Sequence, residues 1–203
     1  WILLCCTGKK AVIAIRRARA SDASAIGELH VAVWRSAYAG LMPDAYLAGL
    51  SATRLAASYK RDMFDLRGGY DVFVAVASGD DAPEGSAPEE ATIIGFASGG
   101  RSRRGGLADG EINTLYLNED YRDRGTGRRL MRAAAAHLRV VGCRSAMVWV
   151  LKDNPTQWFY RHLGGRVVAR GQTRVGGQPV EQVAMLWEPI DTLLAATAAA
   201  PEA

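Results

Sequence analysis

The segment EDYRDRGTGRRLM, residues 119 to 131, constrains the fold more than any other stretch of the chain. It follows INTLYLN, whose alternating apolar residues are typical of a strand, and it leads into RLMRAAAAHLRVV, whose pattern is typical of a helix. A glycine-rich turn of this kind gathers unpaired backbone N–H groups at the positive end of the helix dipole, where phosphate binds well. We therefore predict an anion site between a strand over 110–118 and a helix over 126–141.

The segment alone leaves one alternative open and excludes two others. An arginine-rich helix start that faces solvent and binds nothing explains the same residues. A Walker loop is excluded, because no Gly-Lys-Ser or Gly-Lys-Thr follows. The dinucleotide-binding fingerprint is excluded, because its third glycine would fall at Leu130 and no acidic residue lies about twenty positions further on.

The rest of the chain alternates between strand and helix patterns, which predicts a mixed α/β fold. Further strands are expected over 11–19, 71–78, 91–99 and 145–152, and a hairpin over 165–174 and 181–189. Further helices are expected after a cap at Ser21 and Asp22, then over 43–50, 51–64 and 154–163. The acidic, Pro/Gly/Ser-rich stretch 79–90 reads as a flexible hairpin loop, while residues 1–10 and 191–203 read as tails.

Composition bounds the number of domains and the kinds of partner. With 203 residues and 49% hydrophobic content, the chain can bury one core, so we expect a single domain over 11–190. The formal charge of +4 is a modest basic excess that suits an anionic small molecule or nucleic acid. Three cysteines without disulfide or zinc spacing favour the cytoplasm, and the apolar runs are too short for a membrane span or signal peptide.

Three residues of the opening segment carry a family signature. Arg122, Gly125 and Gly127 reproduce the pattern [QR]-x-x-G-x-[GA], and with TLYL before it, VWVL after it and DNPTQWFYRHLGG beyond, the chain resembles the GNAT superfamily of acetyl-CoA-dependent N-acetyltransferases. The resemblance runs from about residue 13 to 188. It implies a mixed sheet of about six to seven strands with helices on both faces. The two central strands, 110–118 and 145–152, would splay apart so that pantetheine lies between them.

The resemblance also assigns residues to the acetyl-CoA side of the site. The positions that hold the pyrophosphate, mainly through backbone N–H groups, are Arg122, Arg124, Gly125, Thr126, Gly127 and Arg128. Asp123 departs from the family, where many members carry glycine, and a carboxylate there repels a diphosphate unless it turns towards Arg122 or solvent. Leu115 and Leu117 match strand positions whose backbone pairs with pantetheine, or else they are core residues. Asn154 matches an asparagine that contacts the pantetheine arm, although an Asn-Pro pair is also an ordinary helix cap.

The reaction implied by the resemblance needs an acid and a base. Tyr160 is the expected general acid, since a tyrosine of pKa about 10 can protonate a thiolate whose conjugate acid has a pKa of about 8.5. Phe159 and Leu163 should face the core, and Tyr160, turned by about 100° on the helix, should face the cofactor. Only six residues separate Asn154 from Tyr160, one fewer than in much of the family, so Asp153 or the backbone is an alternative to Asn154. Glu111, eleven residues before Arg122, lies where some members place a glutamate base; a surface glutamate is the alternative.

The acceptor and the remaining candidates follow from fewer signals. No metal site is expected, because the three histidines have no second ligand at metal spacing. Cys143 is expected to fill apolar space, since the family's transfer is direct. The acceptor is expected to be an amine on a small molecule or a protein. Its site would be walled by four aromatic residues, or else these residues are ordinary packing: Trp34, Tyr38, Tyr46 and Trp187. A CoA-binding sensor without activity and a basic nucleic-acid-binding module are the alternatives, no membrane partner is expected, and a homodimer is left open.

Overall fold

One mixed sheet organises the structure, a computed structural model that describes residues 13–40, 42–64, 68–78, 92–102 and 106–198. Its seven strands are β1 Ile13–Arg17, β2 Asp71–Ala77, β3 Thr92–Arg101, β4 Gly110–Leu117, β5 Ala146–Leu151, β6 Arg166–Val175 and β7 Gln178–Trp187. They lie in the order β1-β2-β3-β4-β5-β7-β6. Neighbours are antiparallel except β4 and β5, which run parallel at the centre of the sheet. The predicted mixed α/β fold is confirmed.

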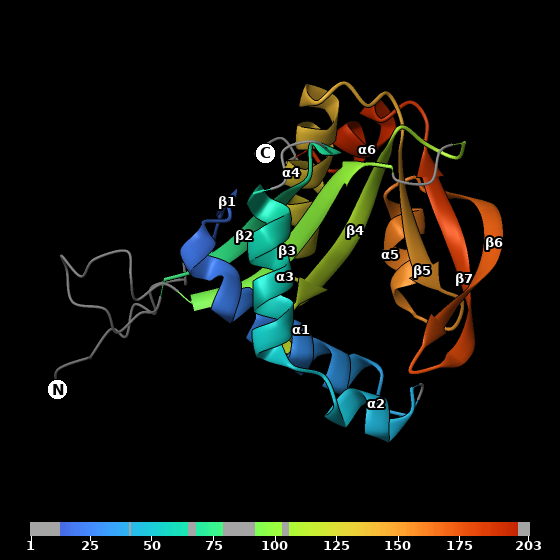
Figure 1. Cartoon of the computed structure of the whole chain (residues 1–203). Helices are drawn as coiled ribbons and strands as arrows, with labels where there is room; N and C mark the ends of the chain where they lie inside the picture. Colours follow the sequence, from blue (N-terminus) through green and yellow to red (C-terminus); the bar gives the residue numbers. More distant parts are fainter. Residues whose placement is uncertain (1–12, 41, 65–67, 79–91, 103–105, 199–203) are drawn as a thin grey trace, which may run out of the picture.

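Helices cover both faces of this sheet (Figure 1). They are α1 Ala23–Ala37, α2 Asp44–Ala48, α3 Ala52–Phe64, α4 Thr126–Val140, α5 Thr156–His162 and α6 Asp191–Ala196, with short 3₁₀ turns at Ala20–Asp22 and Glu119–Tyr121. Helices α1 and α3 pack on one face, and α4 and α5 pack on the other. Among the described residues, the helices are all too short or too polar to cross a membrane.

Two large apolar clusters fix the helices to the sheet. On one face, Ile26, Leu29 and Val33 of α1 follow helical spacing and meet valines of β2 and Phe96 of β3. On the other face, α4 contributes a stripe of fully buried side chains: Leu130, Met131, Ala134, Ala135 and Leu138. Because β2 and β3 lie between these clusters, both faces of the two strands are buried, and each reads as a nearly continuous apolar run.

The centre of the sheet opens where the sequence resemblance predicts it. The β4–β5 ladder pairs residues 110–112 with 146–148 and ends there, although β4 continues to Leu117 and β5 to Leu151. At the same place the β3–β4 register shifts, because Ser98 pairs with Thr114 and Gly99 with Ile112. Asn113 is therefore an extra residue in β4, a bulge that bends the strand away from β5. In Figure 1 the two strands diverge towards their C-terminal ends, with α5 beside β5.

One expectation from the sequence is wrong at the C-terminal end, and another is confirmed only in position at the first helix. Residues 191–198 were expected to be a tail, yet α6 forms there and Leu193 is fully buried against the α4 side of the core. Asp22 is the N-cap of α1, as expected, but its side chain makes no capping bond to α1: it accepts the Arg19 N–H at 2.6 Å and pairs with Arg16, so a 3₁₀ turn precedes α1. The predicted loop over 79–90 and the predicted tail over 1–10 lie outside the described residues.

Candidate functional site

The loop between β4 and α4 has the backbone geometry of an anion-binding turn. Gly125 is the N-cap of α4 with φ of 75°, in the left-handed region that favours glycine. The Arg129 N–H donates to the Gly125 carbonyl at 3.1 Å, so the N–H groups of the preceding residues in the first turn lie ahead of the helical ladder. Asp123 has φ of 60°. Aspartate tolerates this region better than most residues, which explains how it replaces the usual glycine.

The arginines of the segment divide into two groups. Arg122 pairs with Glu119 at 3.2 Å, and the Arg124 guanidinium lies 5.4 Å from the centre of the Tyr121 ring, so both stay on the loop. Asp123 is exposed, and the carboxylate that the structure pairs with Arg122 belongs to Glu119. Three others on α4 donate to backbone carbonyls elsewhere: Arg128 to Ala196, Arg129 to Ile13 and Arg132 to Leu194. The Arg128 guanidinium therefore anchors α6. The backbone N–H of Arg128, and not its side chain, is then the group that suits an anion.

Thr126 and Gly127 complete the first turn of α4. Thr126 is 1% exposed, and within the described part of the chain its hydroxyl is buried without a hydrogen-bond partner. A buried hydroxyl that lacks a partner is costly unless a ligand or water completes it. Gly127 lies beside α5, because a Cβ added there would be 3.6 Å from the Phe159 ring. The loop is thus in contact with the helix that carries Tyr160.

The divergent part of β4 offers a free backbone edge towards β5. Leu115 pairs with Ala97 and Leu117 with Gly95 on β3, while the ladder to β5 has already ended at Ile112. An extended chain can add to such an edge through main-chain hydrogen bonds. The two leucine side chains are half-buried, and that of Leu115 packs against the α4 core. The sequence alternatives for these residues, core packing and backbone contact, are therefore compatible.

Tyr160 is more deeply buried than the sequence predicts. It is 4% exposed and belongs to the α4-side core, with its ring centre 6.1 Å from that of Trp187. Phe159 is half-buried and packs against the same core, as expected, and it also lies against Gly127 in the first turn of α4. The expected facing of Tyr160 towards the cofactor stays a prediction. Burial raises the pKa of Tyr160, and the nearby Tyr38 raises it further, so the hydroxyl keeps its proton at neutral pH.

Asn154 forms the turn that begins α5. Its Oδ1 accepts the Thr156 N–H at 2.8 Å, which is the capping alternative considered for this Asn-Pro pair. Its Nδ2 donates to the Tyr38 hydroxyl at 3.0 Å. Asn154 thus connects α5 to the end of α1, a contact between residues 116 positions apart that no local pattern predicts.

Glu111 lies at the start of the divergence. It pairs with Gly100 of β3 and Met147 of β5, one residue before Ile112, where the β4–β5 ladder ends. Its side chain is half-buried. Ile112 belongs to the α4-side core, so Glu111 beside it faces the α1 side of the sheet. Because of the bulge at Asn113, Thr114 and Tyr116 face that same side.

Aromatic side chains gather on the α1 side of the divergent strands. Trp34 and Tyr38 of α1 have ring centres 4.8 Å apart, and Tyr46 of α2 lies 6.0 Å from Trp34. Tyr116 of β4 belongs to the same group: burial raises its pKa first, and Tyr38, Tyr160 and Tyr46 raise it further. Sequence reasoning missed Tyr116, although its alternation with Leu115 and Leu117 indicated that it faces the opposite side of the strand. Trp187, the fourth aromatic expected here, is instead a core residue that donates to the Leu163 carbonyl at 2.8 Å.

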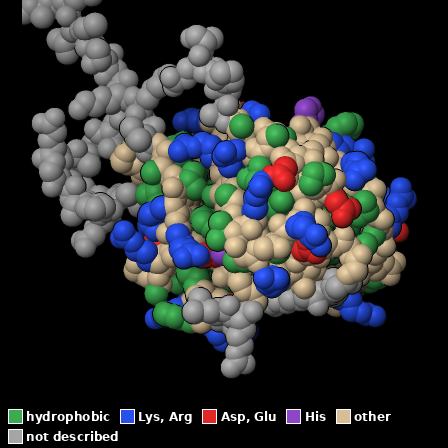
Figure 2. All heavy atoms as spheres, turned by 90° about the horizontal axis from the view of Figure 1, so that it is seen from above, with side chains coloured by type: hydrophobic (Ala, Val, Ile, Leu, Met, Phe, Trp, Pro, Cys, Tyr) green, Lys and Arg blue, Asp and Glu red, His purple; other side chains and the backbone are tan. Residues whose placement is uncertain are grey.

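Cys143 and the basic surface complete the residues singled out in the sequence. Cys143 is 2% exposed in the core and burial raises the pKa of its thiol, which fits an apolar filler. On the face that Figure 2 shows, Lys and Arg side chains of the described residues are spread out, and Asp and Glu lie among them. Arg101 bonds to the Val141 carbonyl at the opposite end of β4 from Arg122. This arrangement disfavours the nucleic-acid alternative.

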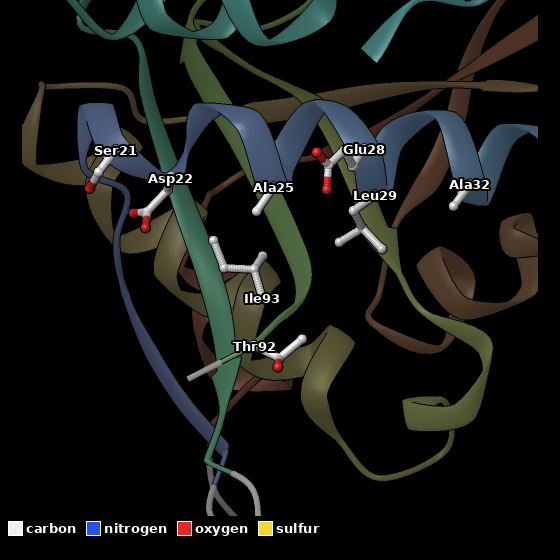
Figure 3. A pocket seen from close by; sticks show the side chains of 8 residues that line it. All are labelled: Ser21, Asp22, Ala25, Glu28, Leu29, Ala32, Thr92 and Ile93. Carbon is white, nitrogen blue, oxygen red and sulfur yellow. The ribbon is translucent and has the colours of Figure 1, made fainter. Parts of the chain in front are cut away.

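A separate hollow of about 410 Å³ lies between α1 and the start of β3 (Figure 3). Ala25, Glu28 and Leu29 point from α1 towards Thr92 and Ile93. None of the predicted site residues lines it. The candidate site is therefore the region around the divergence of β4 and β5, and not this hollow.

The divergent central strands and the helix start beside them define an acyltransferase type of site, and the sequence comparisons agree. The model of the acetyltransferase (GNAT) family matches residues 51–164. An uncharacterized N-acetyltransferase of Bacillus subtilis (strain 168), YuaI, is 30% identical over 184 residues, which are 90% of this chain and 96% of that protein. The chain belongs to the GNAT family of N-acetyltransferases.

Solved structures share the fold at lower sequence identity. PaiA N-acetyltransferase from Thermoplasma acidophilum, in complex with coenzyme A, matches with a TM-score of 0.61 and 19% identity, over 87% of this chain and 99% of that one. YncA, a putative acetyltransferase from Salmonella typhimurium with acetyl-CoA, matches with a TM-score of 0.60 and 19% identity, over 87% and 93%. The central divergence of the sheet therefore belongs to a fold that carries CoA compounds in these two proteins.

Proposed function

We propose that this protein transfers an acetyl group from acetyl-CoA to a primary amine by direct attack, with Tyr160 as general acid and Glu111 as general base. The domain that does so is residues 11–190, extended by α6. The observation that carries the proposal is the coincidence at one place of the β4–β5 divergence, the left-handed turn at Gly125 and the buried Tyr160. Two proteins with the same fold were solved with CoA or acetyl-CoA, which supports acetyl-CoA as the acetyl donor.

The residues of the first turn of α4 suit the diphosphate. The N–H groups of Gly125, Thr126 and Gly127 and the unpartnered Thr126 hydroxyl are donors, and Arg122 and Arg124 add positive charge beside them. The free edge of Leu115 and Leu117 suits the amides of pantetheine. Asn154 supports the acetyl-CoA site indirectly, by holding Tyr38 and the start of α5 in place, since both polar atoms of its side chain already make hydrogen bonds.

In the reaction, the amine nitrogen attacks the thioester carbonyl carbon, and the carbon–sulfur bond then breaks. Glu111 takes the proton that the amine loses, directly or through water, and Tyr160 donates a proton to the departing thiolate. Burial favours this role for Tyr160 because a raised pKa keeps its hydroxyl protonated before the reaction. The same burial makes the phenolate left afterwards costly.

The first experiment is thermal unfolding with acetyl-CoA. A ligand that binds the folded state stabilises it by about 2.7 kcal/mol at a hundredfold excess over its dissociation constant. A folded protein whose melting temperature does not move at millimolar acetyl-CoA would rule out the proposal. If acetyl-CoA stabilises the protein but no amine is acetylated across a broad acceptor panel, the sensor alternative is the correct one.

The second experiment assigns the acid and the base. Tyr160→Phe keeps the ring against Trp187, so acetyl-CoA affinity should change little while kcat falls by about 10² to 10⁴. Glu111→Gln should flatten the rise of activity with pH, because that rise follows the loss of a proton from the general base or from the amine. Wild-type turnover by Tyr160→Phe, under conditions where chemistry limits the rate, would remove Tyr160 from the mechanism.

A further inference from the structure

Trp149 occupies a position on β5 that the proposed mechanism leaves unused. The β4–β5 ladder ends where Ile112 pairs with Val148, so Trp149 is the first residue of β5 beyond it. Val148 and Val150 belong to the α4-side core, and side chains alternate along a strand, so Trp149 faces the α1 side. Trp149 therefore lies at the divergence, on the same face of the sheet as Glu111.

Glu111 and Trp149 are near neighbours across the two central strands. Glu111 pairs with Met147, and Trp149 is two residues further along the same face of β5. Strands lie about 4.8 Å apart and rise about 3.3 Å per residue, so a diagonal pair of this kind has Cα atoms at least about 8 Å apart. A molecule of a few heavy atoms bridges that distance. A ligand whose amine lies at Glu111 therefore has the indole of Trp149 beside the rest of it.

The indole of Trp149 reaches over β7 to β6. Trp149 pairs with Ala184 of β7, and a Cβ added to Gly171 of β6 would lie 3.5 Å from the Cζ3 and Cη2 atoms of the indole. These two small residues leave room for the ring. The side chain is half-buried, so part of its surface is open to a ligand.

Fold stability does not account for the indole nitrogen at this position. The Trp149 Nε1 is buried and, within the part of the chain that the structure describes, has no hydrogen-bond partner. A buried N–H without a partner costs stability, so an apolar residue such as leucine should be tolerated here. The open ring surface, and not the N–H, is then the part of Trp149 that can contact a ligand.

Beyond Trp149 the same face is apolar and aromatic. Leu151, two residues further along β5, packs in one cluster with Tyr38 and Tyr46. A Cβ added to Gly176, in the turn between β6 and β7, would lie 2.9 Å from the Tyr46 Cβ, so this turn and α2 are in contact. A polypeptide needs an open groove, so this contact favours a small molecule as the ligand.

The charge on the two central strands is limited to the proposed base. Glu111 is the only charged residue of β4 and β5. Glu119, just beyond β4, already accepts from the Ser36 hydroxyl at 2.6 Å and pairs with Arg122 at 3.2 Å. Each ammonium group that leaves water needs its own partner. One available carboxylate therefore suits a molecule with one amine.

We propose that Trp149 determines which amine is acetylated, and that the acceptor is a small monoamine with an apolar or aromatic body. Its amine lies at Glu111, and its body packs against the face of the indole. This inference rests on the proposed function and names the acceptor class for it. The reaction is unchanged: the nitrogen–carbon bond forms, the carbon–sulfur bond breaks, and Trp149 takes no part in proton transfer.

The test measures kcat/KM by thiol release for the full chain at saturating acetyl-CoA. The amines are ethylamine, butylamine, phenethylamine, spermidine and a lysine-containing peptide. In the wild type, each added methylene that packs against the protein should raise kcat/KM about fourfold, so phenethylamine should be the best of the five. Trp149→Ala should lower kcat/KM for phenethylamine about tenfold, through the lost ring contact, and leave that for ethylamine within about twofold.

Two further variants make the result interpretable. Trp149→Leu repeats the measurement with much of the apolar volume kept, and it should change the ratio of phenethylamine to ethylamine in the same direction. Trp158→Ala is the matched control: this tryptophan is 67% exposed on α5, which packs on the other face of the sheet, and its loss should change none of the five values.

The outcomes separate this inference from the proposed function. Equal losses for phenethylamine and ethylamine in the Trp149 variants would overturn the role of Trp149, since a merely structural defect lowers both. A wild-type preference for spermidine or the peptide would overturn the acceptor class while leaving acetyl transfer in place. If acetyl-CoA binds and no amine is acetylated, the proposed function itself fails, and the acceptor class fails with it.

Discussion

Replacing Gly125 and Gly127 separately with alanine should shift the stability of the protein in opposite directions. Gly125 has φ of 75°, and an L-residue held there costs about 1–2 kcal/mol, although its Cβ would meet no atom within 4 Å. Gly127 lies outside the left-handed region, and its Cβ would make an ordinary contact with Phe159 at 3.6 Å. Alanine there gains up to about 1 kcal/mol of helix propensity.

The two variants should therefore differ by about 2 kcal/mol in the free energy of unfolding. Effects of a glycine-to-alanine change on the unfolded chain are common to both and cancel in the comparison. In a chain of this size, 1 kcal/mol shifts the melting temperature by about 2–4 °C, so the two melting temperatures should differ by roughly 4–8 °C. Differential scanning calorimetry of both purified variants measures this difference. Equal melting temperatures, or a less stable Gly127→Ala variant, would refute the assignment of the left-handed turn to Gly125.

Three further predictions concern other parts of the molecule. Gly127→Val should weaken acetyl-CoA binding much more than Gly127→Ala, as measured by calorimetric titration, because its branched side chain crowds the N–H groups of the first turn; equal affinities would contradict the proposed diphosphate position. Replacing residues 79–90 by Asn-Gly should preserve activity, since β2 and β3 pair up to Ala77 and Thr92 and a short turn keeps that register; a folded but inactive variant would place the segment in the acceptor site. Burial lowers the pKa of His30 from 6.5 to about 4, so the unfolded chain binds the proton first and stability falls as the pH drops from about 6.5 towards 4. At pH 5 the loss should be roughly 2 kcal/mol by urea unfolding and absent from His30→Gln, and identical pH slopes for the two proteins would disprove it.

Local sequence alone determined most of the elements and the left-handed turn at the start of α4. The alternation before Asn118, the glycines at 125 and 127 and the helical apolar stripe of α4 each act over a few residues, within the range of backbone propensity and periodicity. For the same reason Gly125 and Gly142, both at positive φ, could be placed at the two ends of α4. The divergence of β4 and β5 could also be anticipated, but through the family resemblance and not from the residues by themselves.

Only the tertiary structure decided how the site's side chains are used. Tyr160 is buried deep in the core and Phe159 lies at its edge because α5 packs against the first turn of α4, a contact between segments more than thirty residues apart. The bond between Asn154 and Tyr38 and the burial of Leu193 depend on packing of the same kind. Periodicity identifies which face of a helix is apolar, but it does not say which neighbour will cover that face. That choice is made by the global packing of the core, and it determines which hydroxyl lies next to which.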